Sequence, residues 1–360
     1  MDFKKAIVLL GPRQVGKSTL IQKIANESGL EFLIINADNP AERLLWTNPD
    51  FELIKSLIAP FKLIIFDEAQ RIENIGLTCK MIIDAGSGHQ VIITGSSALG
   101  LGDQIYEPLT GRKWDFEMYP VAWEELSNTY TLAKALPMLE NLMIYGSYPD
   151  VINHSEDKAE VLESLAGSYL YKDVLELGGI RKPEILTKLL QALAWQVGSE
   201  VSFHELSKTL GIDKETVSKY IDLLEKSFVI FRLGPLARNE RKEISTSRKI
   251  YFYDNGIRNA IIGNFKPLSQ RNDVGPIWEN FIIAERLKKN SYHKLRLKTW
   301  FWRNKSQAEI DYIEESPEGI TAFELKWSEK KKAKFSTSFT DFYQPSGTQV
   351  INRQNYWKYL

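Results

Sequence analysis

The chain has 360 residues with 46 basic and 46 acidic side chains, so its formal net charge is zero. This length exceeds what one hydrophobic core usually serves and predicts two or three domains, while the neutral balance excludes a bulk electrostatic attraction to nucleic acid. Cys79 is the only cysteine, which excludes an intramolecular disulfide and a zinc site built from several cysteines. No apolar run approaches the roughly 20 residues that span a bilayer. We therefore expect a cytoplasmic protein without a membrane anchor.

The first apolar run is followed at once by a glycine-rich loop. Residues 7–10, IVLL, end in Gly-Pro and predict a strand buried on both faces. Residues 11–18 satisfy GxxxxGK[ST], the loop whose backbone N–H groups surround phosphates. A helix expected from about Lys17 to Ser28 turns its positive end toward the same anion. The stretch predicts that a nucleoside triphosphate is bound by Gly11, Pro12, Arg13, Gln14, Val15, Gly16, Lys17, Ser18 and Thr19.

Hydrolysis needs a metal ligand and a group that orients water, and residues 61–70, FKLIIFDEAQ, supply both. Residues 63–66 predict a second buried parallel strand, and Asp67 stands at its carboxyl end, where open α/β sheets place their ligand sites. We expect Lys17 to reach the β- and γ-phosphates, and Ser18 and Asp67 to hold Mg²⁺. Glu68 is then placed to polarise the attacking water.

A third apolar run, residues 91–93, ends in Thr-Gly-Ser-Ser. The Ser96 hydroxyl is a candidate to contact the γ-phosphate or the water, although a serine there equally well caps a following helix. Arg112, in LTGRKWDFEMYP, is a candidate to stabilise charge on the transferred phosphoryl group, either within the chain or across a subunit boundary.

The middle of the chain changes character after about residue 125. Residues 134–175 are helical in pattern, with a break at YGSYP, and predict a lid or connector. Helical spacing then recurs over 184–197, 202–210 and 214–226, with Ser202 and Asp213 as N-caps and Gly211 as a C-terminal stop. Two strands, FVIFRL and KIYFYD, follow and complete the pattern of a winged helix-turn-helix.

The third of these helices would enter the major groove in a DNA-binding version of the fold. Its candidates for contact are Lys214, Thr216, Ser218 and Lys219. Acidic residues on the same helix oppose a phosphate backbone, so a packing module between domains is the favoured interpretation and a DNA reader the alternative.

The last hundred residues predict a second chemical site. GPIWENFIIAERLKK reads as a helix carrying Glu279, and three strands separated by turn signals follow it. Asp311 lies inside one strand, and Glu324 and Lys326 lie two residues apart on one face of the next. This order resembles the PD-(D/E)xK nuclease core, in which carboxylates bind Mg²⁺ and the lysine helps to activate water. Charged residues on a solvated strand face are the alternative.

Motifs along nearly the whole chain resemble one known family. They include GPRQVGKSTL, LIIFDEAQRI, VIITGSSA, YFYDNGIRNAIIG, GPIWENFIIAERL and AFELKWS. The sequence resembles the P-loop ATPases of the AAA superfamily, in the archaeal-type, STAND-like subgroup with a C-terminal restriction-endonuclease-like domain of unassigned function. The resemblance implies an α/β fold with a P-loop parallel sheet.

The predicted division has four parts: an ATPase domain at 1–125, a helical lid or connector at 126–180, a winged helix-turn-helix at 181–265, and a PD-(D/E)xK-like domain at 266–360. We expect an ATPase that requires ATP and Mg²⁺ and works as a nucleotide-driven switch. It would act on DNA or on a protein partner, as a monomer or a homo-oligomer. One alternative is an ATP-regulated, metal-dependent DNA nuclease. A second is a nucleotide-binding interaction protein with little turnover.

Overall fold

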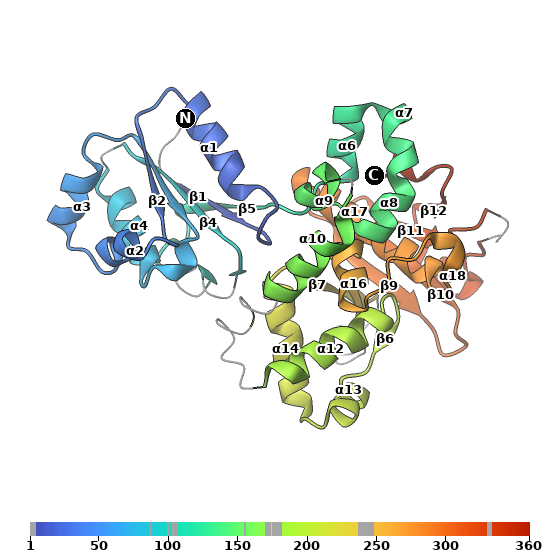
Figure 1. Cartoon of the computed structure of the whole chain (residues 1–360). Helices are drawn as coiled ribbons and strands as arrows, with labels where there is room; N and C mark the ends of the chain where they lie inside the picture. Colours follow the sequence, from blue (N-terminus) through green and yellow to red (C-terminus); the bar gives the residue numbers. More distant parts are fainter. Residues whose placement is uncertain are drawn as a thin grey trace. The chain divides into compact units, whose positions relative to one another are not determined.

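The computed structural model describes residues 5–86, 88–98, 101–102, 105, 107–154, 156–169, 174, 182–236, 248–329 and 333–360. They form two compact units, the first mainly of residues up to Tyr119 and the second mainly of residues from Pro120 onward. Figure 1 shows the helices and strands of each unit. Within the described parts of the chain, none of the helices combines the length and the apolar character that crossing a membrane requires.

The first unit contains a five-stranded sheet in the order β2–β3–β4–β1–β5. All neighbouring strands in it are parallel, so their carboxyl ends meet at one edge. The strands predicted at 7–10, 63–66 and 91–93 are confirmed and lie side by side. The strands are β1 (Ala6–Leu10), β2 (Phe32–Asn36), β3 (Leu63–Asp67), β4 (Gln90–Gly95) and β5 (Lys113–Glu117).

Helices pack on both faces of this sheet. Ile21 and Ala25 of one helix pack against the Ile65 face, whereas Trp46 of another meets the ring of Phe66 edge-on at 5.1 Å. Because residues 65 and 66 point to opposite faces of the strand, these two helices cover opposite sides. The helices of this unit are α1 (Lys17–Glu27), α2 (Pro40–Trp46), α3 (Phe51–Ile58), the short η1 (Ala69–Arg71) and α4 (Ile75–Asp84).

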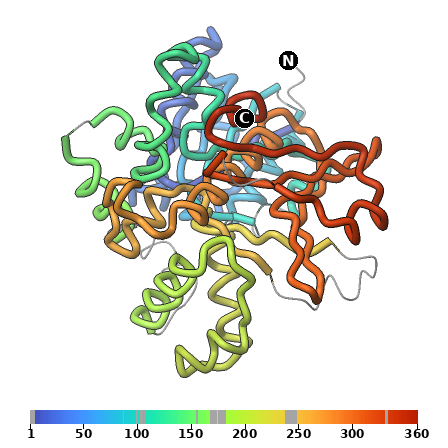
Figure 2. Tube along the Cα trace, turned by 90° about the vertical axis from the view of Figure 1, so that its right-hand side faces the viewer, coloured from blue at the N-terminus to red at the C-terminus, as the bar shows by residue number. Residues whose placement is uncertain are grey.

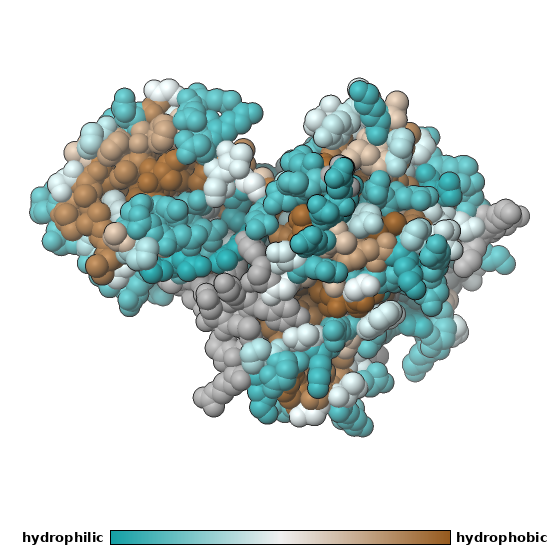
Figure 3. Space-filling model, viewed as in Figure 1, coloured by the Kyte–Doolittle hydropathy of each residue, from teal (hydrophilic) through white to brown (hydrophobic). Residues whose placement is uncertain are grey.

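Apolar side chains also reach the surface of the first unit. Brown atoms gather over it in Figure 3. Leu20 and Ile24 of α1 are exposed, as are Trp114 and Phe116 of the edge strand β5. Since Trp114 and Phe116 are two residues apart, they lie on one face of the strand. The helices of this unit therefore leave part of its apolar surface uncovered.

The second unit contains a seven-stranded mixed sheet in the order β12–β11–β10–β9–β7–β8–β6. Strands β7 and β9 pair in parallel and join the strands of the predicted winged region to those of the predicted C-terminal domain. The strands, several of which run side by side at the orange-to-red end of the tube in Figure 2, are β6 (Glu200–Val201), β7 (Ile230–Pro235), β8 (Arg248–Phe252), β9 (Lys298–Arg303), β10 (Glu309–Ser316), β11 (Gly319–Leu325) and β12 (Gly347–Ile351).

Several helices of the second unit lie where the sequence patterns predict them, whereas α6, α16 and α18 were not predicted. Short helices occupy the described part of 134–175, and Gly146, with φ of 68°, lies at the predicted break. The elements are α6 (Trp123–Tyr130), α7 (Leu132–Ala135), η2 (Leu136–Met138), α8 (Leu139–Tyr145), α9 (Pro149–Asn153), α10 (Lys158–Ser164), η3 (Leu165–Tyr169), α12 (Pro183–Trp195), α13 (Phe203–Leu210), α14 (Lys214–Lys226), α16 (Asn255–Ile261), η4 (Leu268–Gln270), α17 (Val274–Tyr292), α18 (Thr337–Tyr343) and η5 (Tyr356–Lys358).

Local capping residues explain the bounds of α13 and α14. Ser202 Oγ accepts a hydrogen bond from the backbone N–H of Glu205 at 3.3 Å, and Gly211 ends the helix with φ of 66°. Asp213 accepts from the N–H of Thr216 at 2.7 Å. These contacts satisfy backbone donors that the first turn of a helix otherwise leaves unpaired, so the predicted caps are confirmed.

Candidate functional site

The loop between β1 and α1 follows the carboxyl end of a central strand. A Cβ on Gly11 would lie 2.0 Å from the carbonyl oxygen of Met118, and Gly16, the N-cap residue just before α1, has φ of 100°. Both positions therefore require glycine, the first because of a close approach and the second because of its left-handed backbone. The motif residues fold as a tight loop that ends at the N-terminus of α1.

Lys17 lies inside this loop. Its Nζ donates hydrogen bonds to the carbonyl oxygens of Gly11 and Pro12, both at 2.8 Å, and the residue is only 4% exposed. These acceptors are neutral, so an anion bound in the loop can replace them as partners of the ammonium group. Among the other predicted loop residues, Val15 is buried, whereas Gln14 and Thr19 are exposed.

Two hydroxyl groups converge on the carboxylate that ends β3. Ser18 Oγ donates to Asp67 Oδ2 at 2.8 Å, and the hydroxyl of Thr94 on β4 donates to Asp67 Oδ1. A hydroxyl and a carboxylate are the hard oxygen ligands that Mg²⁺ takes beside substrate phosphates, so these residues fit the ion. The structure brings the predicted metal ligands Ser18 and Asp67 together.

Glu68 is held by a residue that the sequence interpretation missed. Gln70 is 7% exposed, and its Nε2 donates both to Glu68 Oε2 at 2.7 Å and to Ser96 Oγ at 3.0 Å. Arg13 Nε also approaches Ser96 Oγ, at 3.4 Å. The network joins the phosphate loop, the end of β3 and the end of β4. A polar residue two positions after Glu68, inside DEAQ, was the only sequence signal for it.

Arg112 is placed at the other end of the sheet. Its carbonyl oxygen accepts from the N–H of Ala6, at the start of β1, whereas the phosphate loop follows the end of that strand. Its side chain pairs with Asp84 at 2.7 Å and is 42% exposed. The structure thus does not bring Arg112 to the loop within one chain, and a role across a subunit boundary stays a prediction.

The predicted C-terminal site residues lie on α17 and β10 and at the end of β11, all in the second unit. Lys326 Nζ lies 2.9 Å from Asp311 Oδ2 and 2.7 Å from Glu324 Oε2. Asp311 also accepts from the backbone N–H of Leu325 at 2.7 Å. Burial raises the pKa of Glu279, on α17; the charge of Lys249 opposes this rise and the charge of Asp311 adds to it. The structure therefore brings these four residues into one electrostatic cluster.

Strand β8 adds two side chains that the sequence interpretation did not place here. Lys249 Nζ lies 3.0 Å from Glu279 Oε1 and also pairs with Glu309. Tyr251 donates its hydroxyl to Glu279 Oε1 at 2.6 Å. Lys249 is the last residue of the basic stretch RNERKEISTSRK (238–249), a composition typical of solvated surface, yet Lys249 is only 2% exposed. The alternation of polar and apolar residues in KIYFYD was the signal that Lys249 and Tyr251 share a face.

We call these residues the carboxylate cluster: Lys249, Tyr251, Glu279, Glu309, Asp311, Glu324 and Lys326. Burial and the nearby Asp311 raise the pKa of Glu324 to about 7. Burial lowers the pKa of Lys249, but the charges of Glu279 and Glu309 outweigh burial and raise it overall. In the described part of the chain, no three Asp, Glu, His or Cys side chains are arranged to hold a metal ion. The carboxylates surround two ammonium groups instead.

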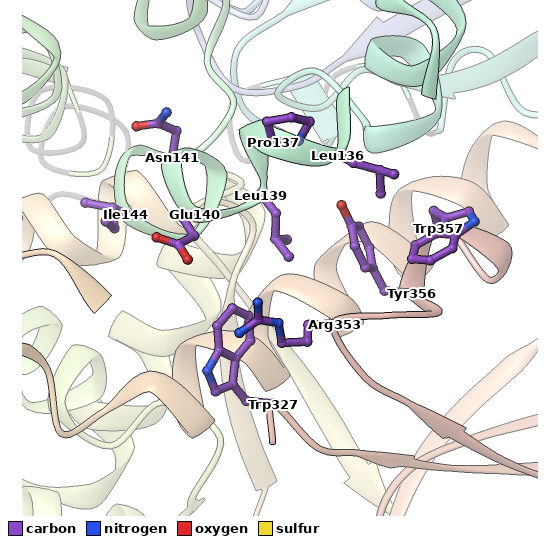
Figure 4. Close-up of a pocket in the computed structure, with 10 residues that line it drawn as sticks. All are labelled: Leu136, Pro137, Leu139, Glu140, Asn141, Ile144, Trp327, Arg353, Tyr356 and Trp357. Atoms are coloured by element: carbon purple, nitrogen blue, oxygen red, sulfur yellow. The ribbon is translucent and has the colours of Figure 1, made fainter. Parts of the chain in front are cut away.

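A cavity of about 530 Å³ lies elsewhere in the second unit, between α8 and the residues around η5 (Figure 4). Leu139 lines one wall, and Trp327 and Trp357 line the other. The guanidinium of Arg353 lies over the ring of Trp327, 5.3 Å from its centroid. The buried hydroxyl of Tyr356 has no hydrogen-bond partner among the described residues. No residue of the carboxylate cluster lines this cavity, so the two features are separate.

Three successive segments of the chain each match a different protein family. Residues 3–127 match the AAA domain. Residues 136–268 and 274–357 match two domains of unknown function, DUF8612 and DUF4143 respectively. Each family covers less than half of the chain, and the first coincides with the unit that carries the phosphate loop.

Similar whole proteins occur in bacteria and archaea. The uncharacterized protein Rv2008c of Mycobacterium tuberculosis is 27% identical over 325 residues, which cover 89% of this chain and 70% of that protein. An uncharacterized protein of Haemophilus influenzae is 26% identical over 314 residues, covering 80% of this chain and 75% of the relative. The uncharacterized protein MJ1544 of Methanocaldococcus jannaschii is 26% identical over 332 residues, covering 86% and 72%.

Among solved structures, the Thermotoga maritima RuvB Holliday junction branch migration motor matches with a TM-score of 0.30 and 14% identity, over 67% of this chain and 87% of that one. That score is too low to carry an argument. The AAA match and the loop geometry together support one conclusion: the first unit is an α/β domain similar to the P-loop ATPases of the AAA type.

Proposed function

We propose that the chain is an Mg²⁺-dependent ATPase that acts as a nucleotide-driven switch. The observation that carries the proposal is the convergence of Lys17, Ser18 and Asp67 at one edge of a parallel sheet. Bound Mg²⁺ would supply positive charge between the phosphate oxygens, where negative charge develops during transfer. The match of residues 3–127 to the AAA domain supports the same function.

The chain's own residues have distinct tasks in this reaction. Lys17 exchanges its two carbonyl acceptors for the β- and γ-phosphate oxygens of ATP, and Ser18 and Asp67 hold the ion. Glu68 orients the water that attacks the γ-phosphate, and Gln70 fixes the Glu68 carboxylate through its 2.7 Å hydrogen bond. Catalysis of this kind depends on positioning and on charge stabilisation rather than on covalent chemistry. The products are ADP and phosphate.

The test separates binding from turnover. Glu68→Gln should keep Mg·ATP affinity, measured by calorimetry, and lose about 100-fold in phosphate release, because orienting the water is a transition-state task. Glu73→Gln, at an exposed position just beyond η1, is the matched control and should behave as the unchanged protein. Normal turnover in Glu68→Gln would reject its role. Tight ATP binding without any turnover in the unchanged protein would favour an interaction switch instead.

We further propose that residues 181–265 form a winged helix-turn-helix that serves as a packing module. The order α12, β6, α13, α14, β7, β8 supports that fold, with β6 and β7 both antiparallel to β8. The parallel pairing of β7 with β9 supports the packing role. The hydroxyl of Thr216, a candidate for DNA contact, donates to Asp213 at 2.6 Å, and acidic neighbours oppose a phosphate backbone.

We also propose that the chain acts on DNA or on a protein partner and forms a homo-oligomer. The proposed domains meet at residues 125, 180 and 265. ATP turnover measured with and without duplex DNA tests the first of these. A stimulation of several-fold supports coupling to DNA, whereas equal rates favour a protein partner. The exposed apolar residues of α1 and β5 supply surface for association, which sedimentation at several protein concentrations tests.

The second candidate function is a metal-dependent nuclease in the PD-(D/E)xK-like region 266–360. One observation favours it: Glu279, Asp311 and Glu324 cluster with Lys326, and the buried Oε1 of Glu324 has no hydrogen-bond partner among the described residues. The unpaired carboxylate oxygen of Glu324 is of the hard type that a divalent cation prefers. Bound there, the cation would polarise a phosphodiester and the attacking water.

The nuclease test uses the full chain, plasmid DNA and either Mg²⁺ or Mn²⁺, with products separated on a gel. Nicking by the unchanged protein should be lost in Asp311→Asn and in Lys326→Ala. Lys358→Ala, at an exposed lysine of the same unit, should retain it. Intact plasmid with both metals would reject the nuclease function and leave the ATPase proposal standing, because the two sites use separate carboxylates.

A further inference from the structure

We propose that Lys249 is the resident counterion of the carboxylate cluster, and that a divalent cation binds there by displacing its ammonium group. The inference rests on the second candidate function and deepens it, because it names what controls access to the metal site. Lys249 lies on β8, outside the region 266–360 that the PD-(D/E)xK pattern covers.

The contacts of Lys249 place its charge between two elements. Its Nζ pairs with Glu279 of α17 at 3.0 Å and with Glu309 of β10, and its side chain is 3% exposed. A buried ammonium of this kind is retained because its carboxylate partners compensate the loss of water. Tyr251 donates a further hydrogen bond to the same oxygen of Glu279. The position that a cation bound to Glu279 would occupy is therefore already filled.

The charge balance of the cluster leaves room for more positive charge. Four carboxylates (Glu279, Glu309, Asp311 and Glu324) surround two ammonium groups (Lys249 and Lys326). With every group ionised, the negative charges exceed the positive ones by two, or by one if Arg303 is included, whose Nε lies 4.0 Å from Glu309 Oε2. Glu324 Oε1 is buried and has no hydrogen-bond partner among the described residues. The cluster thus has fewer donors than its buried oxygens require, which a divalent cation would correct.

The same contacts explain why the described carboxylates do not form a ready metal site. An ammonium group holds its oxygens at about 2.7–2.9 Å, whereas Mg²⁺ needs several oxygens converging at about 2.0–2.1 Å. Glu279 pairs with Lys249, whereas Asp311 pairs with Lys326. Each carboxylate is therefore held by a different ammonium group, and the two do not converge on one point. Withdrawal of Lys249 frees Glu279 to turn toward Asp311 and Glu324.

Lys249 also links the carboxylate cluster to the proposed winged helix-turn-helix. Strand β8 pairs with β7 through Ile250 and with β6 through Lys249 itself. A ligand or partner that shifts β8 would therefore change the affinity of the cluster for metal. The effect is one of differential binding, since metal and ammonium compete for the same oxygens.

The test measures Mn²⁺ binding to the full chain without nucleotide, from the loss of the free-ion paramagnetic resonance signal. All proteins compared, including the parent, carry Asp67→Asn, which removes the predicted metal-binding carboxylate of the first unit. Lys249→Met keeps the length of the side chain and removes its charge, and it should bind Mn²⁺ at least about tenfold more tightly, because a unit charge close to the ion opposes binding. Lys249→Arg should bind no more tightly than the parent, and Lys298→Met, at an exposed lysine of β9, should match the parent.

The outcomes separate this inference from the proposal beneath it. Equal Mn²⁺ affinity in the parent and in Lys249→Met overturns the displacement and leaves the metal site intact. No binding by any variant overturns both. Binding by Lys249→Met alone supports the inference and shows that the parent is closed to metal. If Lys249→Met does not fold, the comparison is made between Glu309→Gln and Lys249→Met/Glu309→Gln, which loses one charge of each sign, and the double variant should again bind more tightly.

Discussion

The phosphate loop and the carboxylate cluster assemble their polar side chains in different ways. In the first, residues 11–18 are contiguous, and the remaining groups end strands β3 and β4, which lie beside β1 in a parallel sheet. In the second, the groups come from β8, α17, β10 and β11 and depend on pairings between distant segments. A contiguous site is readable from a local pattern, whereas a dispersed one requires the fold.

The two regions also differ in the charge of the groups that accept hydrogen bonds from their lysines. Lys17 rests on neutral carbonyl oxygens, so an incoming phosphate can replace them with little loss. Lys249 rests on two carboxylates, so its departure leaves charge that only another cation can balance. The first region thus offers an ammonium group to an anion, whereas the second offers carboxylates to a cation that must displace Lys249.

The largest expected effect comes from the contiguous site. Lys17→Ala should weaken ATP affinity by about 100-fold or more, because each charge-assisted hydrogen bond to a phosphate contributes roughly 1.5–3 kcal/mol. Calorimetry with Mg·ATP measures the change. Lys23→Ala, an exposed lysine on the same helix, is the control and should keep full affinity. Unchanged affinity in Lys17→Ala would remove the phosphate-loop assignment and, with it, the contrast between the regions.

Much of the fold was predictable because its signals are local. Apolar runs ending in Gly or Asp predicted β1 and β3, and helical spacing with caps at Ser202 and Asp213 predicted α13 and α14. Asp311, Glu324 and Lys326 were predictable as a set because charged residues inside apolar strands need partners. Each of these signals lies within one element or between consecutive elements.

The rest depends on contacts that no local pattern records. The pairing of β7 with β9 joins segments 66 residues apart at Gly234 and Trp300, and no local pattern indicates that Lys249 is buried beside Glu279. Arg112 looked close to the phosphate loop because the direction of β5 and its pairing with β1 were unknown. Gln70 escaped notice since its partner Ser96 lies on another strand.

Gln70 tests whether a residue outside the loop motif also matters in the first region. Gln70→Leu should lower the maximal rate of ATP turnover by about tenfold, because a misplaced catalytic group loses rate, while the affinity for Mg·ATP stays within about twofold. Gln22→Leu, at an exposed glutamine of α1, is the control. A rise in turnover would contradict the prediction and mean that Gln70 restrains Glu68 in an inactive position.

The smallest expected effect is on the stability of the second unit, outside the carboxylate cluster, and it depends on pH. Asp273, at the start of α17, accepts from Arg271 Nε at 2.8 Å and from Arg258 Nη1 at 2.6 Å. Burial would raise the pKa of Asp273, but the hydrogen bonds from Arg271 and Arg258 outweigh burial and lower it from 3.8 to about 2. Because the folded-state pKa is depressed, the stabilisation is present above about pH 4 and is lost as the pH falls through 2.

Asp273→Asn should therefore lower the melting temperature at pH 7 by roughly 5 °C and should flatten its fall between about pH 4 and pH 2. Thermal unfolding followed by circular dichroism at several pH values measures both changes. Asp341→Asn, an exposed carboxylate of the same unit, should keep the full acid-induced fall. ATP affinity should remain unchanged in Asp273→Asn, since α17 belongs to the second unit. A loss of ATP affinity in Asp273→Asn would contradict this prediction. It would show that ATP binding depends on the stability of the second unit.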